Sequence, residues 1–138
     1  MESIKVKDYM NKRPVTFKAL MSLPIALKKM LNAHQTGGPV VDDNNHVMGF
    51  LSEQDIIHQL LKMGYYCQGN NTVGDCMHRE VVVVSPDESI LKLAEDMLPG
   101  KPKVYPVCKN GRLLGVVSRR DILKAIATQI DDCFHHPV

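Results

Sequence analysis

The sequence has little of what marks membrane, secreted or nucleic-acid-binding proteins. No uncharged apolar run approaches the roughly 20 residues that a membrane-spanning helix needs. Residues 1–7 lack the apolar core of a signal peptide. Basic and acidic residues nearly balance, 17 against 15, no long basic block occurs, and aromatic residues make up only 5%. Nucleic-acid binding is therefore not indicated, and we expect a cytoplasmic protein with no membrane segment.

The four cysteines form no Cys-x-x-Cys pair and occur in no secretory context, which favours reduced thiols over disulfides. The spacing of His58, Cys67, Cys76 and His78 matches no zinc-ligand pattern. Residues 133–136 read Cys-Phe-His-His and are a slightly better metal candidate, but a frayed C-terminal tail explains them more simply. We therefore expect no metal and no required cofactor.

The sequence does contain a seven-residue pattern that occurs twice. Residues 49–55 read Gly-Phe-Leu-Ser-Glu-Gln-Asp, and residues 115–121, 66 positions later, read Gly-Val-Val-Ser-Arg-Arg-Asp. Both copies are glycine, two apolar residues, serine, two polar residues and aspartate. A 138-residue chain that repeats such a block is expected to contain two copies of one unit.

Two further blocks recur in the same order, each 67 positions apart. Val-x-Asp-x-Met occurs at 6–10 and 73–77, and Pro-Val occurs at 39–40 and 106–107. The first copy carries one extra residue within 42–46, a polar stretch of turn chemistry that tolerates insertion. The order of the blocks and the position of the insertion indicate a duplication.

Each half is predicted to form strand, helix, strand, strand, helix. The strands are expected at 15–17, 39–42 and 46–51, and at 81–84, 104–108 and 113–117. The last two strands of each half are joined by a polar turn, which indicates a hairpin. About 60 residues of this kind bury little surface alone, so the two halves are expected to pack together.

Helices are predicted between and after these strands. One should run from Leu23 to Ala33 with Leu27, Met30 and Leu31 on one side. Its counterpart should begin at Ser85-Pro86-Asp87-Glu88, which resembles a helix cap. The repeated serines should start two more helices, whose apolar stripes reach Leu61 and Ile130.

The repeated Ser-x-x-Asp has two interpretations. As a capping box, the serine hydroxyl accepts from the backbone near the aspartate, and the aspartate favours the positive end of the helix dipole. As a ligand site, the free N–H groups of the helix start attract a phosphate, and the carboxylate accepts hydrogen bonds from a ribose diol. One helix start offers enough donors for both.

Taken together, the blocks resemble a tandem pair of cystathionine-β-synthase (CBS) domains, also called a Bateman module. The resemblance covers about residues 5–130 and rests on the Val-x-Asp-x-Met, Pro-Val and Gly-φ-φ-Ser-x-x-Asp blocks, where φ is apolar. It implies an α+β fold of two pseudo-symmetric β-α-β-β-α repeats packed as one module. The expected divisions are repeat 1 at 1–64, a linker at 65–72, repeat 2 at 73–130 and a tail at 131–138.

The resemblance implies two ligand clefts, each built across the repeats, in which Asp55 and Asp121 hold ribose hydroxyls and Ser52 and Ser118 lie near ribose or phosphate. The first cleft would combine Thr16, Thr36 and Gly37 with Ser118, Arg119, Arg120 and Asp121. The second would combine Val83, Lys103 and Val104 with Ser52, Glu53, Gln54 and Asp55.

The two clefts differ in charge. Two arginines follow the serine of the first cleft, whereas Glu53 and Gln54 follow the serine of the second. Glutamate repels phosphate, although Lys103 can offset this repulsion. We therefore expect the Asp121 cleft to bind the more highly charged ligand, and more tightly. A solvated helix start is the alternative interpretation of Arg119 and Arg120.

The leading functional hypothesis is a regulatory module that binds an adenosine-containing ligand such as AMP, ADP, ATP or S-adenosylmethionine. It would form a homodimer and modulate an effector protein through a ligand-induced population shift. The alternative is a structural dimerisation or interaction module that binds no nucleotide. No nucleophile–base arrangement indicates an enzyme, and no catalytic residue is assigned.

Overall fold

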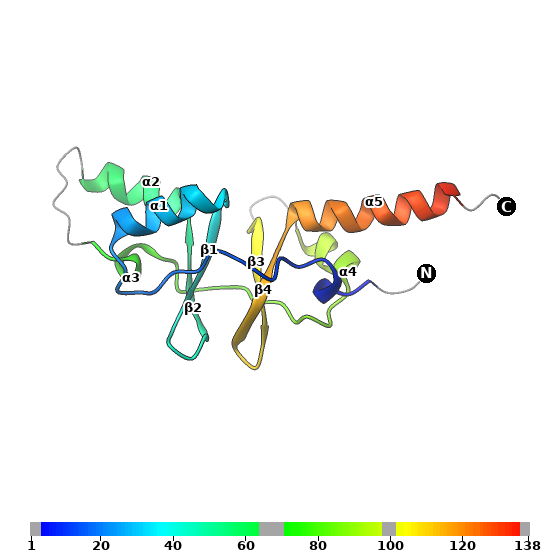
Figure 1. Cartoon of the computed structure of the whole chain (residues 1–138), viewed down its shortest axis with the longest axis horizontal. Coiled ribbons are helices and arrows are strands. Elements are labelled where there is room, and N and C mark those ends of the chain that lie inside the picture. The colour runs from blue at the N-terminus through cyan, green and yellow to red at the C-terminus, as the bar shows by residue number, and fades with distance from the viewer. Residues whose placement is uncertain (1–3, 64–70, 98–101, 136–138) are drawn as a thin grey trace.

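The computed structural model describes residues 4–63, 71–97 and 102–135. The central elements are two hairpins that lie side by side, with α1 and α2 on one side and α4 and α5 on the other (Figure 1). In chain order the elements are η1 (Val6–Asp8), α1 (Leu23–Ala33), β1 (Gly37–Val41), β2 (Val47–Ser52), α2 (Glu53–Met63), α3 (Val73–Cys76), α4 (Ile90–Asp96), β3 (Val104–Lys109), β4 (Arg112–Ser118) and α5 (Arg119–His135). The α+β class expected from the sequence is confirmed.

The two hairpins have equivalent registers. β1 pairs with β2 so that Gly37 faces Ser52, and β3 pairs with β4 so that Val104 faces Ser118. Each ladder has an irregularity after the fourth residue of its first strand, between Val40 and Val41 in β1 and between Val107 and Cys108 in β3. The expected hairpins are confirmed, and each places its repeated serine beside the first residue of its own hairpin.

The hairpins also contact each other near their turns. Leu113 N donates to the Asn45 carbonyl at 2.9 Å, and Asn45 Nδ2 donates to the Leu113 carbonyl at 3.0 Å. Asn45 and Asn110 adopt positive φ angles of 64° and 55°, which asparagine tolerates in tight turns. The polar turns that the sequence predicted therefore also join the two halves.

The predicted strands at 15–17 and 81–84 are wrong. Phe17 and Val84 each form a single parallel bridge, to Val40 and Val107. Neighbouring backbone groups bond to side chains instead of to a strand: Val15 N donates to Gln35 Oε1, and Lys29 Nζ donates to the Thr16 carbonyl. These groups are satisfied outside a ladder, so the pairing does not extend.

The helix α1 has the predicted bounds, with Ser22 as its N-cap and His34 in the left-handed conformation after its end. Leu31, however, is 63% exposed rather than on the packed face, where Ala26 and Met30 are buried. The apolar stripe of α1 is thus narrower than the sequence suggested.

The predicted helix start at Ser85 is also wrong, because α4 begins at Ile90 with Ser89 as its cap. Glu88 Oε2 does accept from Ser85 N at 2.9 Å, but this bond closes a turn. The Pro86 and Glu88 carbonyls accept from the N-terminal segment around η1, so they are not available to a helix.

The Val-x-Asp-x-Met segments of the two halves are exchanged between the cores. Val6 is fully buried in the core of the second half, and Val73 is fully buried in the core of the first. Val6 N donates to the Glu88 carbonyl and Val73 N donates to the Met21 carbonyl, both at 2.9 Å. Each core thus needs a segment of the other half, which explains why the halves pack as one module.

The two long helices that follow the repeated serines are α2 and α5. α5 continues to His135, beyond Ile130, where its apolar stripe was expected to end. None of the helices in the described part of the chain combines the length and the apolar character that a membrane crossing requires.

Candidate functional site

Both Ser-x-x-Asp blocks form reciprocal capping boxes. In the first, Ser52 N and Ser52 Oγ donate to Asp55 Oδ2, both at 2.8 Å, and Asp55 N donates to Ser52 Oγ at 3.2 Å. In the second, Ser118 N and Ser118 Oγ donate to Asp121 Oδ2 at 2.8 and 3.0 Å, and Asp121 N donates to Ser118 Oγ at 3.4 Å. The capping interpretation is confirmed, and each serine and aspartate is held rigidly where β2 or β4 passes into a helix.

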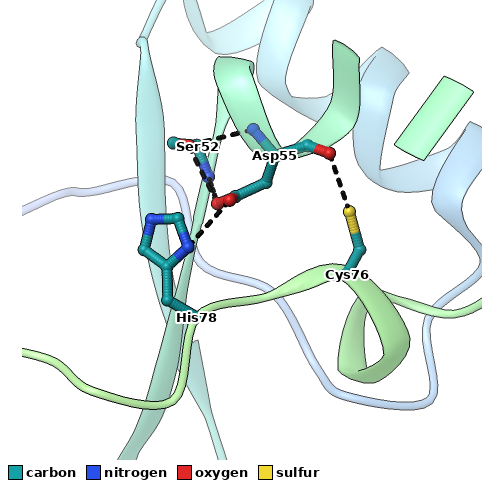
Figure 2. Close-up of polar contacts among 4 residues, drawn as sticks. All are labelled: Ser52, Asp55, Cys76 and His78. Carbon is teal, nitrogen blue, oxygen red and sulfur yellow. Dashed lines mark hydrogen bonds and ion pairs between the residues drawn. The ribbon is translucent and has the colours of Figure 1, made fainter. Parts of the chain in front are cut away.

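The two aspartates differ in their second carboxylate oxygen. His78 Nδ1 lies 2.7 Å from Asp55 Oδ1, as Figure 2 shows, and the Asp55 side chain is only 12% exposed. Among the described residues, Asp121 Oδ1 has no such partner. The position that corresponds to His78, 67 residues earlier, holds Asn11, whose Oδ1 accepts from Arg13 N at 2.9 Å.

His78 is placed beside Asp55 by the segment that follows α3. His78 and Phe50 exchange two backbone hydrogen bonds, each 3.0 Å long, so this segment runs antiparallel to β2. Cys76, on α3, donates through Sγ to the Asp55 carbonyl at 3.2 Å (Figure 2). Burial, and then the nearby carboxylates of Asp55 and Asp75, raise the pKa of the Cys76 thiol, so this cysteine is a poor nucleophile.

A cavity of about 650 Å³ opens next to this arrangement. Its walls come from both halves: the start of α2, the segment after α3, the start of β3 and the start of α5. It is lined by Thr36, Phe50, Ser52, Glu53, Gln54, Ile57, His78, Glu80, Val81, Val82, Pro102, Lys103, Val104, Pro106 and Arg119. The volume lies within the range usual for small-molecule sites.

The structure brings together five of the residues expected to bind ligand, namely Thr36, Ser52, Lys103, Val104 and Arg119, with Glu53 and Gln54 beside them. The other expected residues do not line this cavity: Thr16, Gly37, Asp55, Val83, Ser118, Arg120 and Asp121. Asp55 lies immediately behind the wall, because His78 and Ser52 both bond to it.

Thr36 and Arg119, which we assigned to the first cleft, therefore line a cavity with members of the second. Two pseudo-equivalent hydrogen bonds account for this: Glu53 N donates to the Thr36 carbonyl at 3.0 Å, and Arg119 N donates to the Lys103 carbonyl at 3.2 Å. Each helix start is thus tied to the residue before the first strand of its own hairpin. β1 also contacts β3, so both tied pairs lie near the boundary between the halves.

Several of the lining residues were not predicted from the sequence to bind a ligand. They are Phe50, Ile57, His78, Glu80, Val81, Val82, Pro102 and Pro106. One signal was present: His78 directly follows the second Val-x-Asp-x-Met block, and that block is among the duplicated ones. His78 lies beside β2 because the segment that begins at Val73 packs in the core of the other half, which the sequence does not show.

The cavity is electrostatically mixed. Lys103 and Arg119 supply positive charge, and Glu53 and Glu80 supply negative charge. Ile57, Val81 and Val82 form apolar wall. Such a lining suits a ligand with an apolar ring and a charged or polar end.

A second, shallower hollow of about 460 Å³ lies between α4 and α5. It is lined by Ala94, Met97, Arg119, Ile122 and Leu123.

The described residues contain no group of three or more histidine, cysteine or acidic side chains arranged to hold a metal. Cys67, His136 and the side chain of Cys133, which entered the metal hypotheses, lie outside the described part.

The CBS domain model matches the chain twice, at residues 6–62 and 73–128. The chain therefore belongs to the CBS domain family, and its two halves are a tandem CBS pair. It is 28% identical over 131 residues to the uncharacterized protein MJ1225 of Methanocaldococcus jannaschii, a match that covers 95% of this chain and 45% of that protein. The chain spans less than half of the length of several curated relatives that it matches.

Solved structures show the same fold. The structure of CBSX2, a protein of Arabidopsis thaliana, in complex with AMP is 29% identical, has a TM-score of 0.78, and the match covers 92% of this chain and 98% of that one. The CBS domain pair of protein MJ0100 in complex with 5′-methylthioadenosine and S-adenosyl-L-methionine is 25% identical, also has a TM-score of 0.78, and the match covers 89% and 99%.

Proposed function

We propose that this CBS pair is a regulatory module that binds an adenosine-containing ligand in the 650 Å³ cavity between its halves. The main support for this proposal is the lining of the cavity, which comes from both repeats and combines cationic side chains with apolar surface. Similar CBS pairs have been solved with AMP and with S-adenosyl-L-methionine and 5′-methylthioadenosine, which supports an adenosine compound. AMP, ADP, ATP and S-adenosylmethionine are the candidate ligands.

The residues divide by chemistry into three roles. Lys103 and Arg119 would neutralise a phosphate or carboxylate. The apolar wall around Val81 and Val82 would contact the adenine ring. The hydroxyl of Thr36 would bond to the polar middle of the ligand.

A ligand in this position would contact both halves at once. The arrangement in which Thr36 and Lys103 approach the ligand together would be stabilised over other arrangements, which is a population shift. The stabilised arrangement would then be recognised by an effector protein. Among the described residues that line the cavity, no nucleophile is hydrogen-bonded to a base, so we propose binding and not turnover.

We also propose a homodimer through α2 and α5, because both helices leave apolar side chains in water. Ile57 and Leu61 on α2 are 56% and 76% exposed, and Leu123 and Ile130 on α5 are 64% and 47% exposed. Apolar side chains exposed on both helices, one from each half, fit a self-complementary interface. Light scattering should show that Leu61→Glu is a monomer, and a matched change at Leu20, 89% exposed outside these helices, should leave the dimer intact.

The ligand test is a thermal-shift and calorimetry panel of AMP, ADP, ATP and S-adenosylmethionine. A ligand at 100-fold excess over its Kd should add about 2.7 kcal/mol to the free energy of unfolding. Lys103→Ala should weaken binding of the phosphate compounds about tenfold, the effect of losing one charge-assisted hydrogen bond. Lys109→Ala is the matched control, because Lys109 lies at the other end of β3 and does not line the cavity.

If none of the compounds binds, the structural interaction module becomes the better interpretation.

The expected difference in ligand binding between the two halves is tested on the same panel of compounds with Asp121→Ala and Asp55→Ala. We propose that the loss of Asp121 weakens binding of the most charged ligand more. Equal losses in both variants would refute this asymmetry.

A further inference from the structure

Both oxygens of the Asp55 carboxylate are engaged within the protein. Oδ2 accepts two hydrogen bonds from Ser52, and Oδ1 lies 2.7 Å from His78 Nδ1. The side chain is 12% exposed, so little of it is accessible to a ligand. A ribose diol donates two hydrogen bonds to a carboxylate and would have to displace His78 to make them.

The imidazole stands between this carboxylate and the cavity. His78 is 52% exposed and lines the cavity, whereas Asp55 does not. Its second ring nitrogen points away from Asp55 in Figure 2. The residue is held in place through its backbone by two 3.0 Å hydrogen bonds to Phe50, so its position does not depend on the Asp55 contact alone.

The other half lacks this arrangement. Asn11 takes the equivalent backbone position beside β4, where it exchanges hydrogen bonds with Val116. Its side chain is used within its own turn, in a bond to Arg13 N. Among the described residues nothing bonds to Asp121 Oδ1, so the two repeated aspartates are not equally available.

We infer that His78 is a specificity-determining residue: it withholds Asp55 from the ligand, so that this cavity recognises an adenosine compound by its anionic group and not by its ribose diol. The inference rests on the proposed function of the cavity. Asp55 on α2 holds His78, and the charged residues that line the cavity with it are Glu53, Glu80, Lys103 and Arg119. The two cations among them, with the free ring nitrogen, are the groups that an anion can approach.

The test compares adenosine with AMP, which differs from it by the phosphate. Affinities are read by NMR from the amide signals of Val81 and Val82, which line this cavity, so that the Asp121 side does not contribute. His78→Asn introduces the residue found at the equivalent position of the first half. It should free Asp55 and tighten adenosine binding about tenfold, the effect of one recovered hydrogen bond to a charged group.

The gain must depend on the freed carboxylate. In the double variant His78→Asn with Asp55→Asn, adenosine affinity should return to the wild-type value. His58→Asn, a change of an exposed histidine on α2 that does not line the cavity, should change nothing. Unchanged adenosine affinity in His78→Asn, with AMP still bound by the wild type, would overturn the role of His78 and leave the proposed function standing.

A measurement on the wild type makes the test independent of the folding of any variant. The ¹⁵N shifts of His78 report whether Nδ1 remains bonded to Asp55. Saturation with AMP should leave Nδ1 unchanged and move the other ring nitrogen. Loss of the Nδ1 bond on AMP binding would overturn the inference, and absence of binding by both AMP and adenosine would overturn it together with the proposed function.

Discussion

Gly115, the glycine of the second repeated block, packs against the chain segment that follows η1. A Cβ atom at Gly115 would lie 2.4 Å from the carbonyl oxygen of Asn11 and 3.2 Å from its carbonyl carbon. The same segment is bonded to β4: Val116 N donates to the Asn11 carbonyl at 3.0 Å, and Asn11 N donates to the Val116 carbonyl at 2.7 Å. Gly115→Ala must therefore separate two backbone segments that two hydrogen bonds hold together.

The expected loss of stability can be worked from these contacts. Overpacking of this kind costs about 1–3 kcal/mol, and two weakened backbone hydrogen bonds add about 1 kcal/mol each. The lower entropy of alanine in the unfolded chain offsets about 0.4–1 kcal/mol. We expect Gly115→Ala to lower the free energy of unfolding by about 2–4 kcal/mol.

Urea denaturation followed by circular dichroism measures this change. Gly111→Ala is the matched control, since it introduces the same methyl group in the turn that precedes Gly115. Apart from Gly111 and its two chain neighbours, no heavy atom of the described residues lies within 4 Å of the added Cβ atom. The cost there comes from the positive φ of 79°, worth about 1 kcal/mol. If Gly115→Ala destabilises the protein no more than Gly111→Ala, the close approach is not what requires glycine there.

Three further predictions concern single side chains. Ser52→Ala should lower the free energy of unfolding by about 1 kcal/mol through loss of the helix cap, measured by urea denaturation, and an unchanged midpoint would contradict it. Hydrogen bonds from the backbone of His46, and less from Asn44, lower the pKa of Asp42 below its ordinary value of 3.8. The ionised carboxylate therefore stabilises the folded state above pH 3.8, and this contribution is lost as the pH falls through the lower folded pKa. The stability difference between wild type and Asp42→Asn should accordingly shrink in acid, and a difference that grows there would refute the sign. Burial raises the thiol pKa of Cys76 and Cys108, so mass spectrometry should find both alkylated by iodoacetamide at pH 8 far more slowly in the folded than in the urea-unfolded protein; equal rates would contradict this.

Local patterns in the sequence predicted the elements that local chemistry controls. The hairpins follow from apolar runs joined by polar turns, and α1 follows from an apolar period that begins after a serine. The Ser-x-x-Asp capping boxes close within four residues, so their geometry needs no information from elsewhere in the chain.

The errors occurred where distant segments compete for the same backbone groups. The Ser85–Glu88 segment has the chemistry of a helix start, yet its carbonyls accept from the N-terminal segment. The stretch around Thr16 has strand composition, but the side chains of Gln35 and Lys29 satisfy its backbone. Neither competitor lies close enough in the sequence to be recognised as one.

The sequence by itself determined that this protein is a duplicated α+β unit and which family its repeated blocks resemble, because these properties reside in spacing along the chain. Only the tertiary structure decided which residues share a cavity and which aspartate is available to a ligand. The exchange of the segments around Val6 and Val73 places His78 beside β2 and next to Asp55. The equivalent exchange places Asn11 beside β4. Two identical Ser-x-x-Asp motifs thus acquire different surroundings, because each motif meets a segment that lies far from it in the sequence.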